Sequence, residues 1–422
     1  MFSLCKPVTS RKRFLPHRAL NSIYTFTLFD KAERVPANEW QQVITPADVF
    51  MDLHYLGVVE QCVHTRLQAR YVLVYQKKKV VGALYFQVVD FRGEIFSEVI
   101  QREMKAQASK RLGIFEHYVE MKKEDVLMRL VTNGNNLISG EYGFRFTHDL
   151  IEEQRLELVL QITDVVAREE RLSKTISAVL IKDYHQPLAP EWLLEEDHYL
   201  PFDVEPNMVV DLPPGIQTIE AYIGMYSKKY RNRAKSILKK REGLRIVNLT
   251  AVETTRYEQQ IYALYEQVFH HAQFKLVKLP VCYFREAKKR FGDQFVMKAF
   301  FIEEQMVAFA SGFVMSDKSF EAHYIGLDYQ LNLQHELYQN ILYCLLAEAM
   351  ANNCVKVNLG RTAAEIKTTV GAYAKPLHCY LKPQNAVSKL IQKPFVKLLA
   401  PAAFTPRNPF KEVEVSETIP SE

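Results

Sequence analysis

This sequence of 422 residues lacks most of the patterns that mark metal-binding, membrane-spanning or exported proteins. Its six cysteines are scattered without CxxC spacing, so neither a zinc site nor a disulfide scaffold is indicated. No run of about 18 apolar residues is present, so we expect no membrane-spanning helix. The basic N-terminus lacks the apolar stretch of about 7 to 15 residues that a signal peptide needs. These absences favour a protein of the reducing cytoplasm that holds no metal.

Composition favours a folded protein with an ordinary surface. Hydrophobic residues make up 48% of the chain and charged residues 24%, as in globular proteins. At about 100 to 200 residues per domain, the length allows two to four domains, and two packed cores are the simplest arrangement. The net charge of +5 is compatible with phosphate-bearing ligands or with peripheral contact to an anionic membrane. We expect no DNA partner.

A strand, a long helix and a second strand follow one another in the last third of the chain. Residues 323–328 form an apolar strand pattern, and Gly326 inside it predicts a bulge or a close backbone approach. Over residues 334–352, apolar positions recur at spacings of three and four, which is the period of an amphipathic helix. Residues 355–359 return as a strand. The loop of residues 360–363 then presents charge.

Each half of the chain predicts antiparallel strands followed by a helix and a returning strand. In the second half, strands are expected at 295–301, 307–315 and 320–327. In the first half, strands are expected at 24–29, 70–75 and 80–89 and helices at 46–62 and 148–171. The returning strand of the first half is expected at 175–182. The recurrence is one of pattern and not of residues. Pro206, Pro213 and Pro214 predict a linker between the halves.

Two motifs in the second half resemble a known family. Leu359-Gly360-Arg361 with Lys367 and Gly371-Ala372 is similar to the "LGR" and "K…GA" elements of GNAT-like acyltransferases of the FemAB and CelD (BcsL) type. Residues 228–233, with the sequence KKYRNR, are similar to the "KYR.R" helix that opens the same domain. The resemblance covers most of residues 205–385, and residues 25–205 look like a divergent first half of a tandem pair.

The resemblance implies a fold, an activity and a division of the chain. The fold is α/β (α+β), with two tandem GNAT-like domains, each a mixed, largely antiparallel sheet flanked by helices. The expected divisions are a basic segment at 1–22, a divergent GNAT-like domain at 23–205, an acyl-transfer domain at 206–385, and an amphipathic and then disordered acidic tail at 386–422. The implied activity is transfer of an acyl group from acyl-CoA to an amine acceptor, with a bacterial lipid or cell-envelope precursor as one candidate. Acyl-CoA is the co-substrate, and no cofactor is tightly bound. The expected location is the cytoplasm, including the inner face of the membrane.

Cationic residues are the candidates for binding the phosphates of the donor. Gly360, Arg361, Thr362 and Lys367 combine cations with backbone amides, although an internal salt bridge is the alternative interpretation of Arg361. A second candidate anion site is formed by Lys228, Lys229, Arg231, Arg233 and Lys235 on the basic helix. This helix would hold a diphosphate, a lipid headgroup or a tRNA backbone, or would simply be a solvated face.

The donor class stays open at this point. The glycine-rich Q/RxxGxG/A phosphate loop of GNAT enzymes is missing, and residues 329–334 occupy its place. Fem-type members share this departure and use aminoacyl-tRNA. The first alternative is therefore a tRNA-dependent ligase acting on a peptidoglycan precursor, and tRNA is a partner only in that case. The second alternative is a non-catalytic GNAT-like module that binds a polyanionic lipid or a partner protein.

Transfer to an amine requires a base and donors for the developing oxyanion, with no covalent nucleophile. We predict His323 as the base, because imidazole titrates near neutral pH, with Glu321 on the same strand face. Tyr324 is expected on the opposite face. A structural histidine is the alternative. Asp183, after a first-half strand, is a further catalytic candidate or a turn residue.

Overall fold

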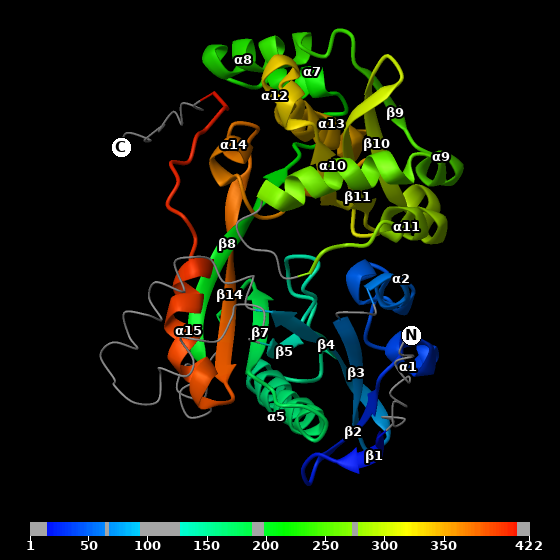
Figure 1. The fold of residues 1–422 in the computed structure, drawn as a ribbon, viewed down its shortest axis with the longest axis vertical. Coiled ribbons are helices and arrows are strands. Elements are labelled where there is room, and N and C mark those ends of the chain that lie inside the picture. The colour runs from blue at the N-terminus through cyan, green and yellow to red at the C-terminus, as the bar shows by residue number, and fades with distance from the viewer. Residues whose placement is uncertain (1–14, 64–66, 93–126, 188–197, 272–276, 412–422) are drawn as a thin grey trace, which may run out of the picture. The chain divides into compact units, whose positions relative to one another are not determined.

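The computed structural model describes residues 15–63, 67–92, 127–187, 198–271 and 277–411. It divides the chain into two compact units. Unit 1 comprises Met1–Val204, Phe274–Tyr283 and Pro376–Ala400, and unit 2 comprises Glu205–Gln273, Phe284–Lys375 and Pro401–Glu422. Each unit has a mixed, largely antiparallel sheet flanked by helices (Figure 1). The predicted α/β fold class is therefore confirmed.

The sheet of unit 1 has the strand order β1-β2-β3-β4-β5-β7-β14. Its strands are β1 (Leu15–Ala19), β2 (Tyr24–Phe29), β3 (Leu67–Gln76), β4 (Lys79–Arg92), β5 (Leu127–Asn133), β7 (Ala178–Tyr184) and, from Pro376, β14 (Tyr373–Pro383), with β6 (Phe144–Phe146) paired to β4. The β3–β4 turn consists of Lys77 and Lys78, both with positive φ, which suits the twist of a two-residue hairpin. Neighbours are antiparallel except β5 and β7, which are parallel.

Helices cover both faces of this sheet because its side chains alternate. α5 (Glu152–Arg171) shares a core with Val72, Val88 and Val131. Tyr71, which points the other way, packs against Trp40 with ring centroids 5.8 Å apart. The remaining elements are η1 (Ala32–Arg34), α1 (Ala37–Trp40), η2 (Val49–Met51), α2 (Leu53–Val63) and α15 (Ala386–Leu399), which continues across Pro394. The helix predicted at 46–62 is thus divided into η2 and α2.

The sheet of unit 2 has the strand order β8-β13-β12-β11-β10-β9. Its strands are β8 (Leu200–Asp211, from Glu205), β9 (Arg245–Asn248), β10 (Phe295–Ile302), β11 (Gln305–Val314), β12 (Ser319–Leu327) and β13 (Lys356–Asn358). Only β12 and β13 run parallel among these neighbours. The three strands predicted over residues 295–327 are therefore confirmed.

The linker predicted at the prolines is wrong in its first part, because residues 200–211 form β8. Pro213 and Pro214 follow this strand, outside any helix or strand. Val210 pairs with Val357 of β13 and is fully buried. Pro206 lies outside the paired residues 209–211, so its missing N–H costs no bond to β13.

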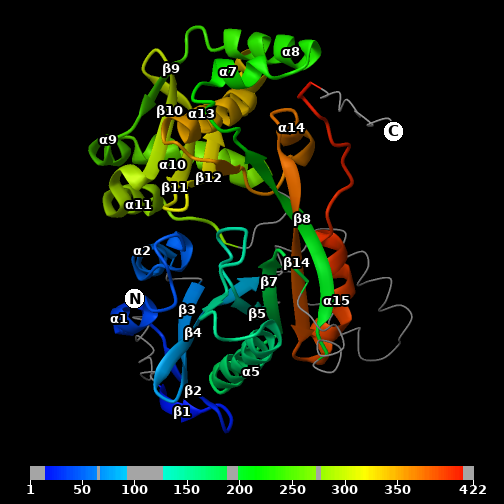
Figure 2. The ribbon, with the colours of Figure 1, turned by 180° about the vertical axis from the view of Figure 1, so that it is seen from behind.

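Helices also cover both faces of the unit 2 sheet (Figures 1 and 2). α13 (Leu337–Ala351) shares a core with Phe320 and Leu327 of β12. α10 (Glu258–His271) lies against Gly326, where a Cβ atom would come within 2.7 Å of the backbone of Leu264. This close approach is one of the two outcomes predicted for the glycine. The other helical elements are α7 (Ile219–Gly224), α8 (Lys228–Lys239), α9 (Ala251–Arg256), α11 (Tyr283–Phe291), η5 (Gly292–Gln294), α12 (Tyr329–His335) and α14 (Ala364–Thr368).

The helix predicted over residues 334–352 is interrupted. Glu336 adopts a left-handed conformation with φ of 48° and separates α12 from α13. The basic helix forms as α8 and is preceded by the separate helix α7, and Tyr222, Ala234 and Ile237 of these two helices are buried. Along the described stretches of the chain, no helix is both long and apolar enough to cross a membrane. The predicted acidic tail at 412–422 lies outside the described residues, as do residues 1–14 of the basic segment and several side chains of the predicted amphipathic segment.

The two units repeat one construction, consisting of antiparallel strands, a crossover helix and a parallel strand. In unit 1 the order is β3-β4-β5-α5-β7, and in unit 2 it is β10-β11-β12-α13-β13. In both, a cation on the first of these strands pairs with a glutamate near the end of the crossover helix. Arg70 Nε lies 2.7 Å from Glu170 Oε1, and Lys298 Nζ lies 2.6 Å from Glu348 Oε2.

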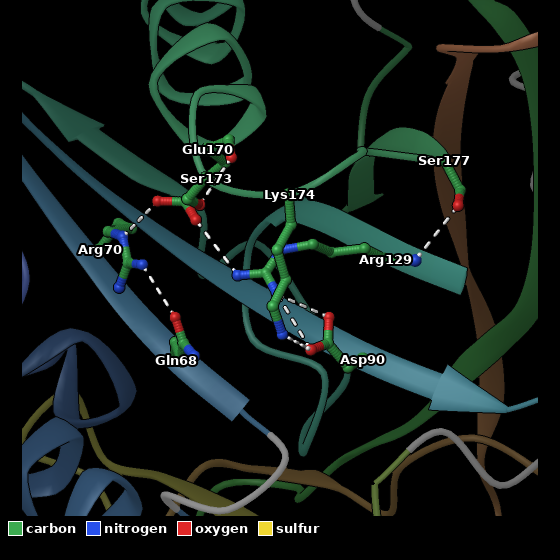
Figure 3. A network of polar contacts seen from close by, with 8 residues as sticks. All are labelled: Gln68, Arg70, Asp90, Arg129, Glu170, Ser173, Lys174 and Ser177. Carbon is green, nitrogen blue, oxygen red and sulfur yellow. Dashed lines mark hydrogen bonds and ion pairs between the residues drawn. The ribbon is translucent and has the colours of Figure 1, made fainter. Parts of the chain in front are cut away.

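In unit 1 this ion pair extends into a buried network (Figure 3). Arg129 Nη2 lies 3.3 Å from Glu170, and Arg129 Nη1 donates to both oxygens of Asp90 at 2.9 Å. Lys174 Nζ also reaches Asp90, at 3.4 Å. Because these cations and carboxylates compensate one another, we assign the network to the fold and not to a binding site.

Candidate functional site

The parallel strands of unit 2 separate early. β12 and β13 pair at only three positions, Ser319 with Lys356, Phe320 with Val357 and Glu321 with Asn358. Beyond them, no described strand pairs with the β13-facing edge of β12 from Ala322 to Leu327. In unit 1 the parallel pairing continues to Asn133, the last residue of β5. The first strand of the pair thus continues beyond the pairing in unit 2, as β12 does, but not in unit 1, where β5 ends with it.

A β-bulge lies on the other edge of the same stretch of β12. Gly312 pairs with Ala322 and Ala310 with Ile325, so His323 and Tyr324 both lie opposite Ser311. The Ser311 hydroxyl donates to the Tyr324 carbonyl at 2.7 Å and accepts from the Tyr324 N–H at 3.0 Å. A bulge breaks the alternation of side chains along a strand. The glycine at position 326 predicted a bulge or a close approach in this strand, and the bulge lies at residues 323 and 324, opposite Ser311.

The bulge places the rings of His323 and Tyr324 on the same face of the unit 2 sheet. The prediction that Tyr324 faces away from His323 is therefore wrong. The His323 ring centroid lies 5.4 Å from that of Phe313 and 4.6 Å from that of Tyr324. Tyr324 also packs against Tyr265 of α10, with centroids 5.6 Å apart. Burial lowers the pKa of His323 to about 3, so the imidazole is neutral at neutral pH.

Glu321 and the loop after β13 are joined through Asn358. Asn358 Nδ2 donates to Glu321 Oε2 at 2.8 Å, and Asn358 Oδ1 accepts from the Gly360 N–H at 2.9 Å. Burial raises the pKa of Glu321 to about 8, against the smaller opposing effect of the Asn358 hydrogen bond. The structure thus gives a site role to Asn358 that we did not assign from sequence.

Lys367 supports the same loop from within unit 2. The side chain is buried, and its Nζ donates to the carbonyls of Gly360 at 3.0 Å and Arg361 at 2.7 Å. Burial lowers its pKa to about 7. Gly360, Thr362 and Ala363 all have positive φ, which is unfavourable for the two non-glycine residues. The lysine therefore stabilises a strained loop in which Arg361 is partly buried and Thr362 exposed.

One cation in the middle of the basic helix α8 forms an ion pair within unit 2. Arg233 Nη2 lies 2.9 Å from Glu336 Oε1, at the junction of α12 and α13. Lys228, Lys229 and Lys235 are exposed, and Arg231 is partly exposed. An open hollow of about 460 Å³ lies at the start of this helix, lined by Ser227, Lys228, Asn408, Phe410 and Lys411. Whether these cations bind an anion stays a prediction.

Asp183 belongs to unit 1. It is fully buried, has a φ of 63°, contacts the Lys182 ammonium group and accepts from the Gly140 N–H at 3.3 Å. All the other predicted catalytic and phosphate-binding residues, Glu321, His323, Gly360, Arg361, Thr362 and Lys367, belong to unit 2. Hydrogen bonds join Glu321 to Gly360 through Asn358, and join Lys367 to Gly360 and Arg361. Within the described residues, no cluster of metal-ligating side chains is present.

No protein-family model and no curated protein matches this sequence. Solved structures with a similar fold include a tandem GNAT protein from the clavulanic acid biosynthesis pathway, with a TM-score of 0.48 and 9% identity over 85% of this chain and 98% of that chain. A GCN5-related N-acetyltransferase from Sphaerobacter thermophilus has a TM-score of 0.41 and 10% identity over 85% and 95% of the two chains. The C-terminal domain of a putative lysylphosphatidylglycerol synthetase from Agrobacterium fabrum has a TM-score of 0.41 and 9% identity, over 65% and 83%. These likenesses concern the fold alone.

Proposed function

We propose that this protein is a GNAT-like acyltransferase that transfers an acyl group from acyl-CoA to an amine, and that unit 2 carries the reaction. The observation that carries the proposal is the early end of the β12–β13 pairing at Glu321 and Asn358, while β12 itself continues to Leu327. A strand that continues beyond the end of its neighbour offers an edge to which an extended ligand can be added. The extended pantetheine arm of CoA, which contains amides, would pair with this edge as an added strand does.

Charged groups beside the opening support a phosphate-bearing donor. Arg361 lies on the loop that Lys367 supports, and Lys228, Lys229 and Lys235 are exposed on α8 of the same unit. The ammonium group of Lys367 itself points at two carbonyls, so we assign it to loop support. In this proposal Arg361 binds a donor phosphate directly.

Glu321 is the better candidate for the base that takes the proton of the attacking amine. General bases work best when their pKa lies near the working pH, and burial raises the pKa of Glu321 to about 8. Burial lowers the pKa of His323 to about 3, so this imidazole is too weak a base to hold the proton. The amine then attacks the thioester carbonyl without a covalent enzyme intermediate. Backbone N–H groups of β12 that face the opening would stabilise the oxyanion.

Aminoacyl-tRNA remains the second candidate donor, because α12 replaces a glycine-rich phosphate loop and α8 exposes cations that suit a longer polyanion. Both donors require the same cationic surface. Direct titration separates them.

The test is isothermal titration of the full chain with acetyl-CoA, palmitoyl-CoA, free CoA and an aminoacyl-tRNA. We expect saturable binding of a CoA thioester that Arg361→Ala weakens by about 10-fold or more, since a lost charged hydrogen bond costs about 1.5 to 3 kcal/mol. Arg256→Ala, which removes an exposed cation on α9, is the matched control and should leave binding unchanged. Binding of aminoacyl-tRNA alone would replace acyl-CoA as the donor, and no binding at all would overturn the enzymatic assignment.

A further inference from the structure

Two cysteines that are 220 positions apart in sequence are in contact in unit 1. The Sγ atoms of Cys62 and Cys282 lie 3.4 Å apart. Cys62 is the next-to-last residue of α2, and Cys282 immediately precedes α11. A disulfide needs the sulfur atoms to approach to about 2.05 Å, which small side-chain rotations can provide from this distance. The contact therefore brings together the two groups that a disulfide requires.

A neighbouring contact holds the same two segments together. The hydroxyl groups of Tyr55, on α2, and Tyr283, next to Cys282, lie 3.2 Å apart, and both side chains are fully buried. Cys62 is 7% exposed, whereas Cys282 is partly exposed. An external reagent would therefore reach Cys282 first.

We propose that Cys62 and Cys282 form a reversible dithiol–disulfide site whose oxidant is a low-molecular-weight disulfide of the glutathione type. The Cys282 thiolate attacks one sulfur of the oxidant, which releases one thiol and leaves a mixed disulfide on Cys282. The Cys62 thiolate then attacks the Cys282 sulfur and displaces the second thiol. Two protein thiols are oxidised, one external disulfide is reduced to two thiols, and the protein protons pass to the released thiolates.

The disulfide would constrain the start of α11. Phe284, two residues after Cys282, packs with ring centroids 5.1 Å from Phe309 and 6.2 Å from Tyr324 at the bulge. Oxidation would also close a long loop between Cys62 and Cys282, which restricts the unfolded chain. We therefore expect the oxidised protein to unfold at a higher temperature than the reduced protein. An effect on acyl transfer would rest on the proposed function, whereas the thiol chemistry does not.

The test uses the reduced full chain, equilibrated in mixtures of reduced and oxidised glutathione, quenched with an alkylating reagent and mapped by mass spectrometry. We expect the wild-type protein to lose two alkylatable thiols and to yield one cross-linked peptide pair containing Cys62 and Cys282. Cys344→Ser is the matched control, because Cys344 is buried on α13, and it should keep this cross-link and the rise in unfolding temperature. Cys62→Ser should accumulate one glutathione on Cys282 and show no rise.

Retention of all thiols in the wild-type protein, or a cross-link that uses another cysteine, would overturn the proposal. A glutathione adduct on Cys282 of the wild-type protein that never resolves would do the same. The measurements of thiol alkylation, cross-linked peptides and unfolding temperature do not depend on the binding of acyl-CoA. Failure of donor binding together with formation of the Cys62–Cys282 cross-link would overturn the proposed function and leave the dithiol site standing.

Discussion

Burial moves two ionisable side chains of unit 2 towards their neutral forms. The pKa of Glu321 is raised to about 8 and that of Lys367 is lowered to about 7. Both groups keep a hydrogen-bond partner in the loop region, Glu321 through Asn358 and Lys367 through the carbonyl of Gly360. The pKa values of Glu321 and Lys367 are thus set by the burial of the two side chains, and each pKa shift has a measurable consequence.

Glu321→Gln should lower kcat by about 100-fold or more, because general base catalysis contributes about 10² to 10⁴. In the wild-type enzyme, kcat/KM should rise with pH through about 8, as Glu321 loses its proton. This rise should be absent in the variant. The measurement is kcat/KM for the amine as a function of pH, and His323→Gln is the control that should keep the rise. An unchanged profile in Glu321→Gln would remove Glu321 from the role of base.

Lys367→Met should abolish a rise in stability with pH. The unfolded chain holds the lysine proton up to a pKa of about 10.5 and the folded chain only up to about 7, so the unfolded state binds more protons between these values. Stability of the wild-type protein therefore gains about 1.4 kcal/mol per pH unit from this group. Urea unfolding at pH 8 and pH 9.5 measures the difference between the two proteins. Glu321 has an opposing effect, because its raised pKa lowers stability as pH rises from about 4.5 through 8, but both proteins contain Glu321 and this effect cancels in the comparison. Equal slopes for both proteins would contradict the shift.

At the scale of the element, the bulge in β12 determines which side chains share the site. Two residues, His323 and Tyr324, lie opposite the single residue Ser311. The Ser311 hydroxyl forms hydrogen bonds with the N–H and the carbonyl of Tyr324, which in a regular strand pair would bond to the backbone of the neighbouring strand. The two rings consequently lie on the face that carries α10, and the strand is bent next to its unpaired edge.

Ser311→Ala should destabilise the protein by about 1 to 3 kcal/mol, because the N–H and carbonyl groups of the half-buried Tyr324 lose the hydrogen bonds that the buried Ser311 hydroxyl makes to them. Donor binding should weaken as well, because the bulge lies on the stretch of β12 beyond its pairing with β13. Chemical unfolding and isothermal titration measure the two effects. Ser319→Ala, which loses a hydroxyl bonded to Asp317 in an exposed turn, should change either quantity far less. Similar effects of the two substitutions would argue against a special role for the bulge.

At the scale of the whole molecule, one construction is used twice with different outcomes. Both units have a crossover helix held by a cation–glutamate pair, Arg70 with Glu170 and Lys298 with Glu348. The parallel strands of unit 1 stay paired to the end of β5, whereas those of unit 2 separate after three positions. We infer that unit 1 gives structural support and unit 2 binds the donor.

The full chain should therefore bind one equivalent of acyl-CoA. Isothermal titration gives the stoichiometry directly, and Arg361→Ala should weaken this single event. Two equivalents with similar affinity would show that unit 1 also binds the donor and would contradict the assignment of a closed strand pair to it.

The sequence by itself determined the elements that depend on local pattern. Alternating and 3.6-residue periodicities predicted β2, β3, β4, the strands of residues 295–327 and most of α5 and α13, because burial of one face imposes these periods on each segment. The fold class was implied by the resemblance of two motifs to GNAT-like acyltransferases. The linker predicted at Pro206 was wrong because this proline lies in β8, outside the residues paired with β13, which local composition does not reveal.

Only the tertiary structure decided how the candidate site is built. The pairing of β12 with β11 and β13, the position of the bulge at Ser311 and the bond from Asn358 to Glu321 all join residues distant in sequence. The same is true of the burial that shifts the pKa values of Glu321, His323 and Lys367. Sequence named these three residues from their chemistry, but the pKa of each depends on the neighbours that exclude water from it.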